Sequence, residues 1–283
     1  MESPLSAPEP GTLSIDIWSD VMCPFCCLGD RHLELALEQF EHRDAVRVLY
    51  HSFLLAPELP EGETMPMIQM LAEHKGMSLE QIHEMHRPLI ARGREVGIDY
   101  AMDDVISSST RRAHELGHFA QARGRGPEMM RRLFRAHWSE GLNLDDVDVL
   151  VRLADEVGLD PEQARTALQE RTWQRAVQDD LTVARSLGGA GRAVLRARLA
   201  LCGLGSAAAG GAAGGAAHRL GRLSGGLRGG RRRPRGRCRA SVRALIGGTS
   251  DRSHFDRIPR CFERILLSSQ GRSNRRSRLG ISP

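Results

Sequence analysis

The sequence predicts an α/β protein in which a strand–helix–strand unit is followed by an all-helical block. Residues 12–19 alternate apolar and polar side chains with period two, as a half-exposed strand does, and residues 46–53 form a second apolar strand. Between them, the apolar residues of 24–40 recur at helical spacing. Two strands joined by one helix imply a parallel pair with a right-handed crossover.

Only helical patterns follow over residues 64–167, and one more helix is expected after them. Capping residues mark several starts, such as Ser78 with Gln81 three residues later. We expect the last helix, 173–187, to pack back against the sheet. The expected helices cover 65–74, 78–96, a segment capped by Ser107, Ser108 or Ser109 and running to Ala122, 127–138, 145–158, a segment starting at Asp160, and 173–187.

The four residues Cys23-Pro24-Phe25-Cys26 join the first strand to the first helix. The unpaired N–H groups and the dipole of a helix N-terminus favour a negatively charged thiolate at Cys23, which is the reactive form of cysteine. Cys26 lies one turn further along and is placed to resolve a disulfide formed by Cys23. Pro24 and Phe25 are expected to tune the redox potential, because Pro24 withholds one backbone N–H from the sulfur. The motif therefore predicts redox chemistry.

A single C-x-x-C could also be half of a zinc site, which requires a second pair of Cys or His ligands. The remaining cysteines form no second C-x-x-C, so redox chemistry is favoured over metal binding. We expect no metal and no organic cofactor. These remaining cysteines are Cys27, Cys202, Cys238 and Cys261.

The charge of the chain changes abruptly near Gly188. Residues 189–283 contain 21 arginines, no lysine and three acidic residues, which gives a formal charge of +18, whereas residues 1–188 carry −13. The arginine-rich run 231–237 could bind nucleic acid through phosphate charge. Out-of-frame translation of GC-rich DNA produces the same composition, and we favour this explanation. A nucleic-acid partner is therefore not expected.

The first residues, 1–11, have no basic start and no apolar core, so they are not expected to be a secretory signal. No stretch approaches the length of a membrane span. We expect a flexible N-terminus, a cytoplasmic location and no membrane partner. In a reducing compartment a C-x-x-C pair is more often catalytic than structural.

Several segments carry a family resemblance over about residues 12–188. They are Ser19–Cys26, Leu28-Gly29, 31–40, Phe53–Pro57, Ser109–His114, Leu133–Trp138, Val149–Ala154 and Gly158-Leu159. Together they resemble the DsbA family of thiol–disulfide oxidoreductases, and its FrnE-like branch, whose members insert a helical domain into a thioredoxin fold. One departure is Cys27, where the family usually has an aromatic residue.

The resemblance implies a division of the chain into parts. Residues 12–63 would be the thioredoxin-like N-terminal unit, 64–167 the helical insert domain, and 168–188 the helix that returns to the thioredoxin part. Residues 1–11 would be a flexible start and 189–283 a low-complexity tail rich in Arg, Gly and Ala, mostly disordered.

The resemblance ends at about Gly188. The family fold continues with two strands, a last helix and a cis proline that faces the cysteines, in a Gly-Val-Pro-Phe-Phe-Val sequence. Here the next proline after Pro161 is Pro234. However, each codon can instead be read from the second base of the present one. In that shifted frame, the DNA that encodes Gly189 to Ala197 is compatible with the sequence Val-Gln-Gly-Val-Pro-Phe-Phe-Val. We therefore interpret the tail as the product of a frameshift that replaced the C-terminal strands, and sequencing codons 186–192 would test this.

Three histidines of the helical block were candidate ligands. His114 and His118 have the spacing of two zinc ligands on one helix, but no third ligand accompanies them, and His137 lies on another helix. All three are more often surface or core histidines than ligands.

Four charged residues also have both a functional and a structural interpretation. Asp16 and Asp20 flank the strand that leads to Cys23 and could transfer a proton, although Asp20 could equally cap the helix. Arg111 and Arg112 could line a substrate groove, although a solvated helix face is favoured.

The sequence thus predicts a DsbA-like thiol–disulfide oxidoreductase with Cys23 and Cys26 as catalytic residues, impaired by loss of the cis-proline region. Its expected partners are protein or small-molecule thiols and disulfides, with glutathione among them. Two alternatives remain open. One is a glutathione-dependent isomerase or transferase of the same fold, against which retention of Cys26 argues. The other is a non-enzymatic binding protein with a basic tail.

Overall fold

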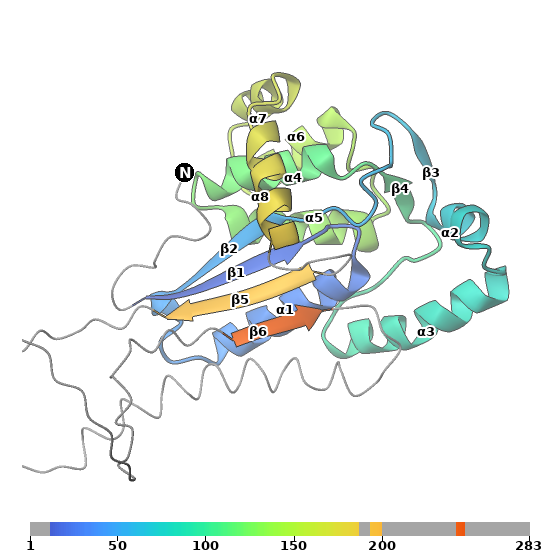
Figure 1. The fold of residues 1–283 in the computed structure, drawn as a ribbon, viewed down its shortest axis with the longest axis horizontal. Helices are drawn as coiled ribbons and strands as arrows, with labels where there is room; N and C mark the ends of the chain where they lie inside the picture. Colours follow the sequence, from blue (N-terminus) through green and yellow to red (C-terminus); the bar gives the residue numbers. More distant parts are fainter. Residues whose placement is uncertain (1–11, 187–192, 200–241, 247–283) are drawn as a thin grey trace, which may run out of the picture.

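A four-stranded sheet with strand order β2-β1-β5-β6 forms the centre of the protein (Figure 1). The structure is a computed structural model and describes residues 12–186, 193–199 and 242–246. Strand β1 (Leu13–Ser19) is buried along its whole length and has a neighbouring strand on each side.

The expected strand–helix–strand unit is confirmed. Strand β1 runs parallel to β2 (Val46–Ser52), with Leu13 opposite Val46 and Ser19 opposite Ser52. Helix α1 (Pro24–Glu38) connects them, followed by a short 3₁₀ turn at Arg43–Ala45. The helix therefore begins directly after the end of the central strand, and this junction places the cysteine motif.

Two further strands are described in the segment where the sequence predicts that the C-terminal strands of the fold are missing or replaced by a tail. Strand β5 (Ala193–Leu199) pairs antiparallel with β1, and β6 (Val242–Ile246) pairs antiparallel with β5. A physical reason is that the free edge of β1 presents unpaired N–H and C=O groups that any compatible segment can satisfy. The remainder of the predicted disordered tail lies outside the described residues, as do residues 1–11.

Six helices make up the described part of the helical block and a seventh, α8, follows it, all close to the predicted positions. Ser78 forms the predicted capping box with Gln81, and the side chains of Asp146 and Asp160 cap the two helices that follow them. The helices are α2 (Met67–Lys75), α3 (Leu79–Glu95), α4 (Arg111–Gln121), α5 (Gly126–Trp138), α6 (Val147–Glu156), α7 (Pro161–Gln169) and α8 (Gln174–Ser186).

The block is not entirely helical, which corrects the sequence prediction. Strands β3 (Thr64–Pro66) and β4 (Ile106–Ser108) form a small antiparallel sheet. Three residues are too few to show a period-two pattern. Ser107 and Ser108 belong to β4 rather than capping α4, whose N-cap is Thr110.

Helix α8 returns to the sheet as predicted, and a buried polar network fixes it there. Asp180 of α8 accepts a hydrogen bond from the Ser52 backbone N–H at 2.8 Å and lies 3.0 Å from both His51 Nδ1 and His118 Nε2. The other ring nitrogen of His51 lies 3.0 Å from Asp16. This network explains why Asp16 and His118, two residues with open roles in the sequence, are buried.

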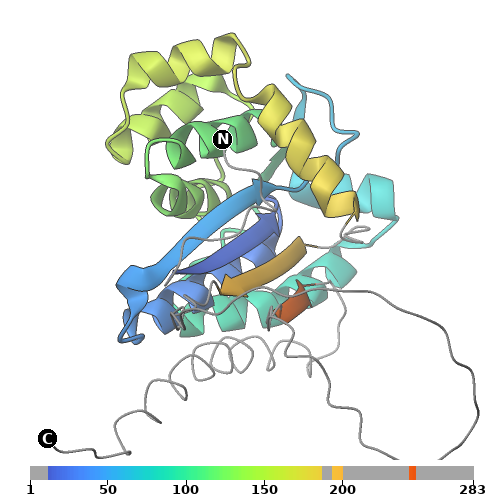
Figure 2. The ribbon, with the colours of Figure 1, turned by 60° about the vertical axis from the view of Figure 1, so that its left-hand side comes forward.

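Helices α4, α5 and α8 contact β2, so most of the block gathers beyond that strand, whereas α1 and α3 lie beneath the sheet in the view of Figure 2. One continuous apolar core runs from Ile15 in β1 through Leu28 in α1 to Leu133 in α5. The start of α1 thus lies where the sheet meets the inserted helices. None of the described helices is long and apolar enough to cross a membrane.

Candidate active site

The cysteine motif forms the first turn of α1, as predicted. Cys23 is the N-cap residue, with extended backbone angles and no side-chain capping bond, and Pro24 is the first helical residue. The carbonyl of Cys23 accepts hydrogen bonds from the N–H groups of Cys26 at 3.0 Å and Cys27 at 3.2 Å. Both residues therefore lie one turn beyond Cys23.

The three cysteines in the described part of the chain are free and buried, and Cys23 is the most exposed of them, at 9% against 5% for Cys26. A side-chain hydrogen bond with Cys23, together with burial, raises the pKa of Cys26 well above its usual value. Cys26 is therefore a thiol at neutral pH, and its S–H can donate to the Cys23 sulfur. Burial raises the pKa of Cys27 to about 12, so this residue too is a thiol.

Two neighbouring aromatic residues of the inserted block form hydrogen bonds to the backbone in and just before the motif. Trp138 of α5 donates its indole N–H to the carbonyl of Val21 at 2.9 Å, and the hydroxyl of Tyr100 donates to the carbonyl of Pro24 at 2.8 Å. Their rings meet edge to face at 5.8 Å. The inserted block therefore sets the conformation of the motif.

Tyr100 could not be predicted as a site residue, because nothing in the spacing of residues links position 100 to position 24. Burial raises the pKa of Tyr100, and the neighbouring Cys27 raises it further, so the hydroxyl remains protonated and can serve as a donor. Trp138 did belong to one of the segments that carry the family resemblance, but its contact with Val21 could not be predicted.

Asp20 neither caps α1 nor lies free beside it. Its fully buried carboxylate accepts hydrogen bonds from the backbone N–H groups of Met22 at 3.2 Å and Leu55 at 2.7 Å, and His114 Nε2 lies 3.4 Å away. The backbone N–H of Asp20 faces the Cys26 sulfur and favours its charged form. Asp20 thus joins the turn before Cys23 to the loop after β2 and to the inserted helix α4.

The histidines and arginines considered as candidate site residues form their hydrogen bonds and ion pairs with groups outside the cysteine motif. Although four apart, His114 and His118 bind different partners, Asp20 and the Asp180 network, and no described group of three or more ligand-type side chains converges on one point. His137 is fully buried near Asp20, and burial lowers its pKa to about 4. Arg111 donates to the carbonyl of Pro57.

The second arginine also pairs with the loop that follows β2. Arg112 lies 3.4 Å from Glu61 and 3.6 Å from Asp145. Phe25 is partly buried against the core. Cys202, Cys238 and Cys261 lie outside the described residues.

Comparison with known proteins identifies a family for this chain. The model of the family described as DSBA-like thioredoxin domain matches residues 14–191, well over half of the chain. The chain belongs to this family. The matched segment of the DsbA-like domain contains the whole motif, the inserted block and helix α8.

The DsbA-like domain is similar to several individual proteins. A probable DsbA oxidoreductase from Streptomyces coelicolor has a similar structure, with 34% identity and a TM-score of 0.60 over 65% of this chain and 80% of that one. An uncharacterized protein of Bacillus subtilis, YwbO, is 30% identical over 164 residues, 58% of this chain and 75% of its own length. Cytosolic disulfide reductase DsbM from Pseudomonas aeruginosa shows 18% identity and a TM-score of 0.46 over 65% and 83% of the two chains.

Proposed function

We propose that this protein is a thiol–disulfide oxidoreductase in which Cys23 is the nucleophile and Cys26 the resolving thiol. One observation carries the proposal. Cys23 stands at the N-terminus of α1, and Cys26, one turn further, is a buried thiol hydrogen-bonded to it. Membership of the DsbA-like family supports the same chemistry.

In the reducing direction the Cys23 thiolate attacks one sulfur of a substrate disulfide. A Cys23–substrate disulfide forms, and the other substrate sulfur leaves as a thiolate that takes up a proton. Cys26 then loses its proton to solvent and attacks the Cys23 sulfur, which releases the second substrate thiol and leaves a Cys23–Cys26 disulfide. A small thiol such as glutathione, or a partner dithiol protein, reduces this disulfide and is itself oxidised. The oxidising direction is the reverse.

In this proposal the substrates are protein and small-molecule disulfides. The protein acts in the cytoplasm. Pro24 and Phe25 set the redox potential between the two sulfurs. No step calls on a metal or an organic cofactor.

A mixed-disulfide trap tests the assignment of both cysteines. In Cys26→Ser, the substrate should remain attached to Cys23, and intact-mass spectrometry should show the added mass, removed by dithiothreitol. Cys23→Ser should trap nothing. Cys27→Ser is the matched control, since it makes the same change one residue further on, and it should turn over substrate normally. Full turnover by Cys26→Ser would instead favour the isomerase or transferase alternative, which needs only the first cysteine.

A further inference from the structure

The loop between β2 and β3 lies alongside the turn that leads into the cysteine motif. At its start, the N–H of Phe53 donates to the carbonyl of Ser19 at 3.1 Å. The Asp20 carboxylate then joins the loop to the turn, because one oxygen accepts from the N–H of Leu55 at 2.7 Å and the other accepts from the N–H of Met22 at 3.2 Å. Leu55 is therefore held beside the turn from which the first cysteine emerges.

The same loop is also fixed further along the chain, where it meets the inserted block. Arg111 of α4 donates to the carbonyl of Pro57 at 3.0 Å. Arg171 binds both carboxylate oxygens of Glu61, at 2.6 and 3.0 Å, and its guanidinium also binds the buried Glu115 of α4. The position of Leu55 is therefore set by the folded protein before any substrate arrives.

Leu55 is exposed although its backbone is fixed. It is 40% exposed, and the other exposed large apolar residues in the described part of the chain are Leu79 and Met85, both on α3. Single apolar residues are common on protein surfaces, so exposure alone indicates no function. The place of Leu55 beside the reactive turn is what distinguishes it from the other two.

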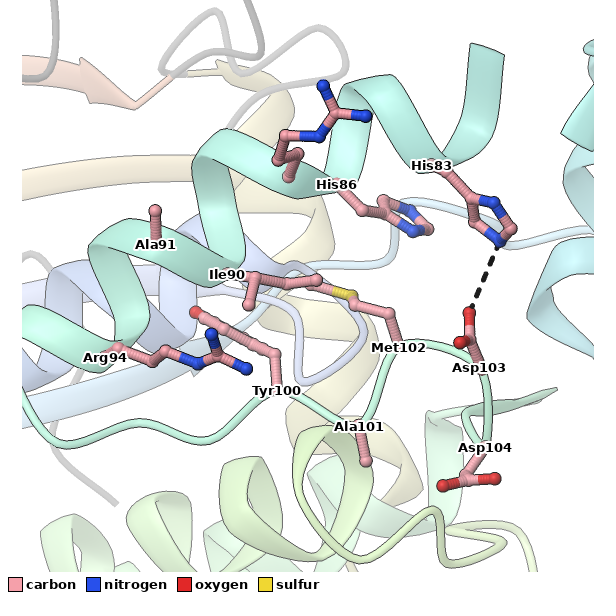
Figure 3. A pocket seen from close by; sticks show the side chains of 11 residues that line it. His83, His86, Ile90, Ala91, Arg94, Tyr100, Ala101, Met102, Asp103 and Asp104 are labelled. Carbon is pink, nitrogen blue, oxygen red and sulfur yellow. Dashed lines mark ion pairs between the residues drawn. The ribbon is translucent and has the colours of Figure 1, made fainter. Parts of the chain in front are cut away.

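The exposed residues of α3 belong to a different part of the surface. This helix approaches the motif through Tyr100, whose ring packs on Gly93 and whose hydroxyl donates to the carbonyl of Pro24. Leu79 is the first residue of α3, about 21 Å along the helix axis from Gly93. Between these positions α3 forms one wall of a pocket of about 540 Å³, which neither Leu79 nor Met85 lines (Figure 3). Leu79 thus offers the same exposed side chain away from the motif.

We propose that Leu55 binds an apolar side chain of a protein substrate, next to the substrate cysteine that Cys23 attacks. A polypeptide joined to Cys23 through its sulfur passes over the surface around the turn, and on the β2 side this surface carries Leu55. Contact removes apolar surface of both partners from water and stabilises the mixed disulfide. The preference rests on the proposed function, in which Cys23 attacks a disulfide, and it favours protein disulfides that have an apolar neighbour.

Two peptides test this preference. Each contains one intramolecular disulfide, and they differ only in having leucine or serine next to the first cysteine. With dithiothreitol as reductant, the wild type should reduce the leucine peptide with a kcat/KM about fivefold higher than that of the serine peptide. Leu55→Gln should lower this ratio to less than about twofold, whereas Leu79→Gln, the matched control on α3, should keep it. No preference in the wild type, or an unchanged preference in Leu55→Gln, would overturn the proposal.

A measurement without turnover separates this proposal from the proposed function. The full chain is used with serine in place of Cys26, Cys202, Cys238 and Cys261, and a single-cysteine version of the leucine peptide is attached to Cys23 chemically, as a thiopyridyl-activated disulfide. The methyl signals of Leu55 should shift in NMR spectra, and those of Leu79 should not. If the wild type reduces neither peptide while the Leu55 signals shift, the proposed function fails and the contact stands. Unshifted Leu55 signals would overturn the contact.

Discussion

The hydroxyl of Tyr100 donates a hydrogen bond to the carbonyl of Pro24, between the two cysteines of the motif, across 76 residues of sequence. The inserted block thus contacts the reactive turn directly. Tyr100→Phe should lower stability by about 1 kcal/mol in urea unfolding, since one hydrogen bond is lost. It should also shift the equilibrium of the cysteine pair against a glutathione redox buffer. An unchanged potential would show that the contact is only structural.

The three cysteines at the start of α1, Cys23, Cys26 and Cys27, should react in a fixed order. Cys23 is the most exposed, whereas the raised pKa values of Cys26 and Cys27 keep these two as thiols at pH 7. Iodoacetamide followed by peptide mapping should therefore find Cys23 modified first, at least tenfold faster. Earlier modification of Cys26 or Cys27 would reverse the catalytic assignment.

Stability should depend on pH through the network of Asp180. Burial alone would raise the pKa of Asp180, but hydrogen bonds from His118 and His51 outweigh it and lower the pKa to about 2. The stabilisation that ionised Asp180 gives the folded protein is complete above its pKa in the unfolded chain, which is near 4. This stabilisation is lost as the pH falls toward 2. The difference in unfolding free energy between wild type and Asp180→Asn should shrink over that range. A constant difference would contradict the linkage.

His51 should make the stability of the protein depend on pH in the neutral to alkaline range. Burial alone would lower its pKa, but Asp16 and Asp180 raise it above the usual value. Its contribution is therefore complete below about pH 6.5 and is lost as the pH rises through the folded pKa. In His51→Gln, the loss of stability at alkaline pH measured by urea unfolding should be smaller than in wild type. An equal loss in the variant and the wild type would show that other groups cause the decrease in stability at alkaline pH.

Strand β5 should be needed for solubility. A chain ending at Ser186 exposes the edge of β1, which β5 otherwise covers, and an open edge invites association between chains. Analytical ultracentrifugation should find aggregates of that chain and monodisperse material for a chain ending at Ile246, which keeps β5 and β6. A soluble, equally stable short chain would show that the β1–β5 pairing is dispensable.

The frameshift interpretation remains a prediction with its own test. Restoring the alternative frame after Gly188 would supply the Val-Pro-Phe-Phe-Val sequence that the family resemblance leads us to expect beside the cysteines. We expect higher reductase activity and solubility than in the present chain. Equal values in both proteins would show that residues 189–283 are a functional tail.

The sequence predicted the elements whose signals are local. The helix after Cys23 and the Ser78 capping box depend on neighbouring residues, and both are found in the structure. Contacts between distant segments leave no such signal. The Tyr100–Pro24 bond, the short strand β4 and the pairing of β5 with β1 arise from packing, which no periodicity records.

The pairing of β1 with β5 also constrains how the protein folds during synthesis. Trp18 lies opposite Val194 and Leu13 opposite Leu199, so about 180 residues separate the partners along the chain. At roughly 5–20 residues per second, β1 leaves the ribosome about 10–40 seconds before its second neighbour exists. During that interval the central strand has one partner. The nascent chain is therefore expected to need a chaperone that covers this strand until β5 has been synthesised.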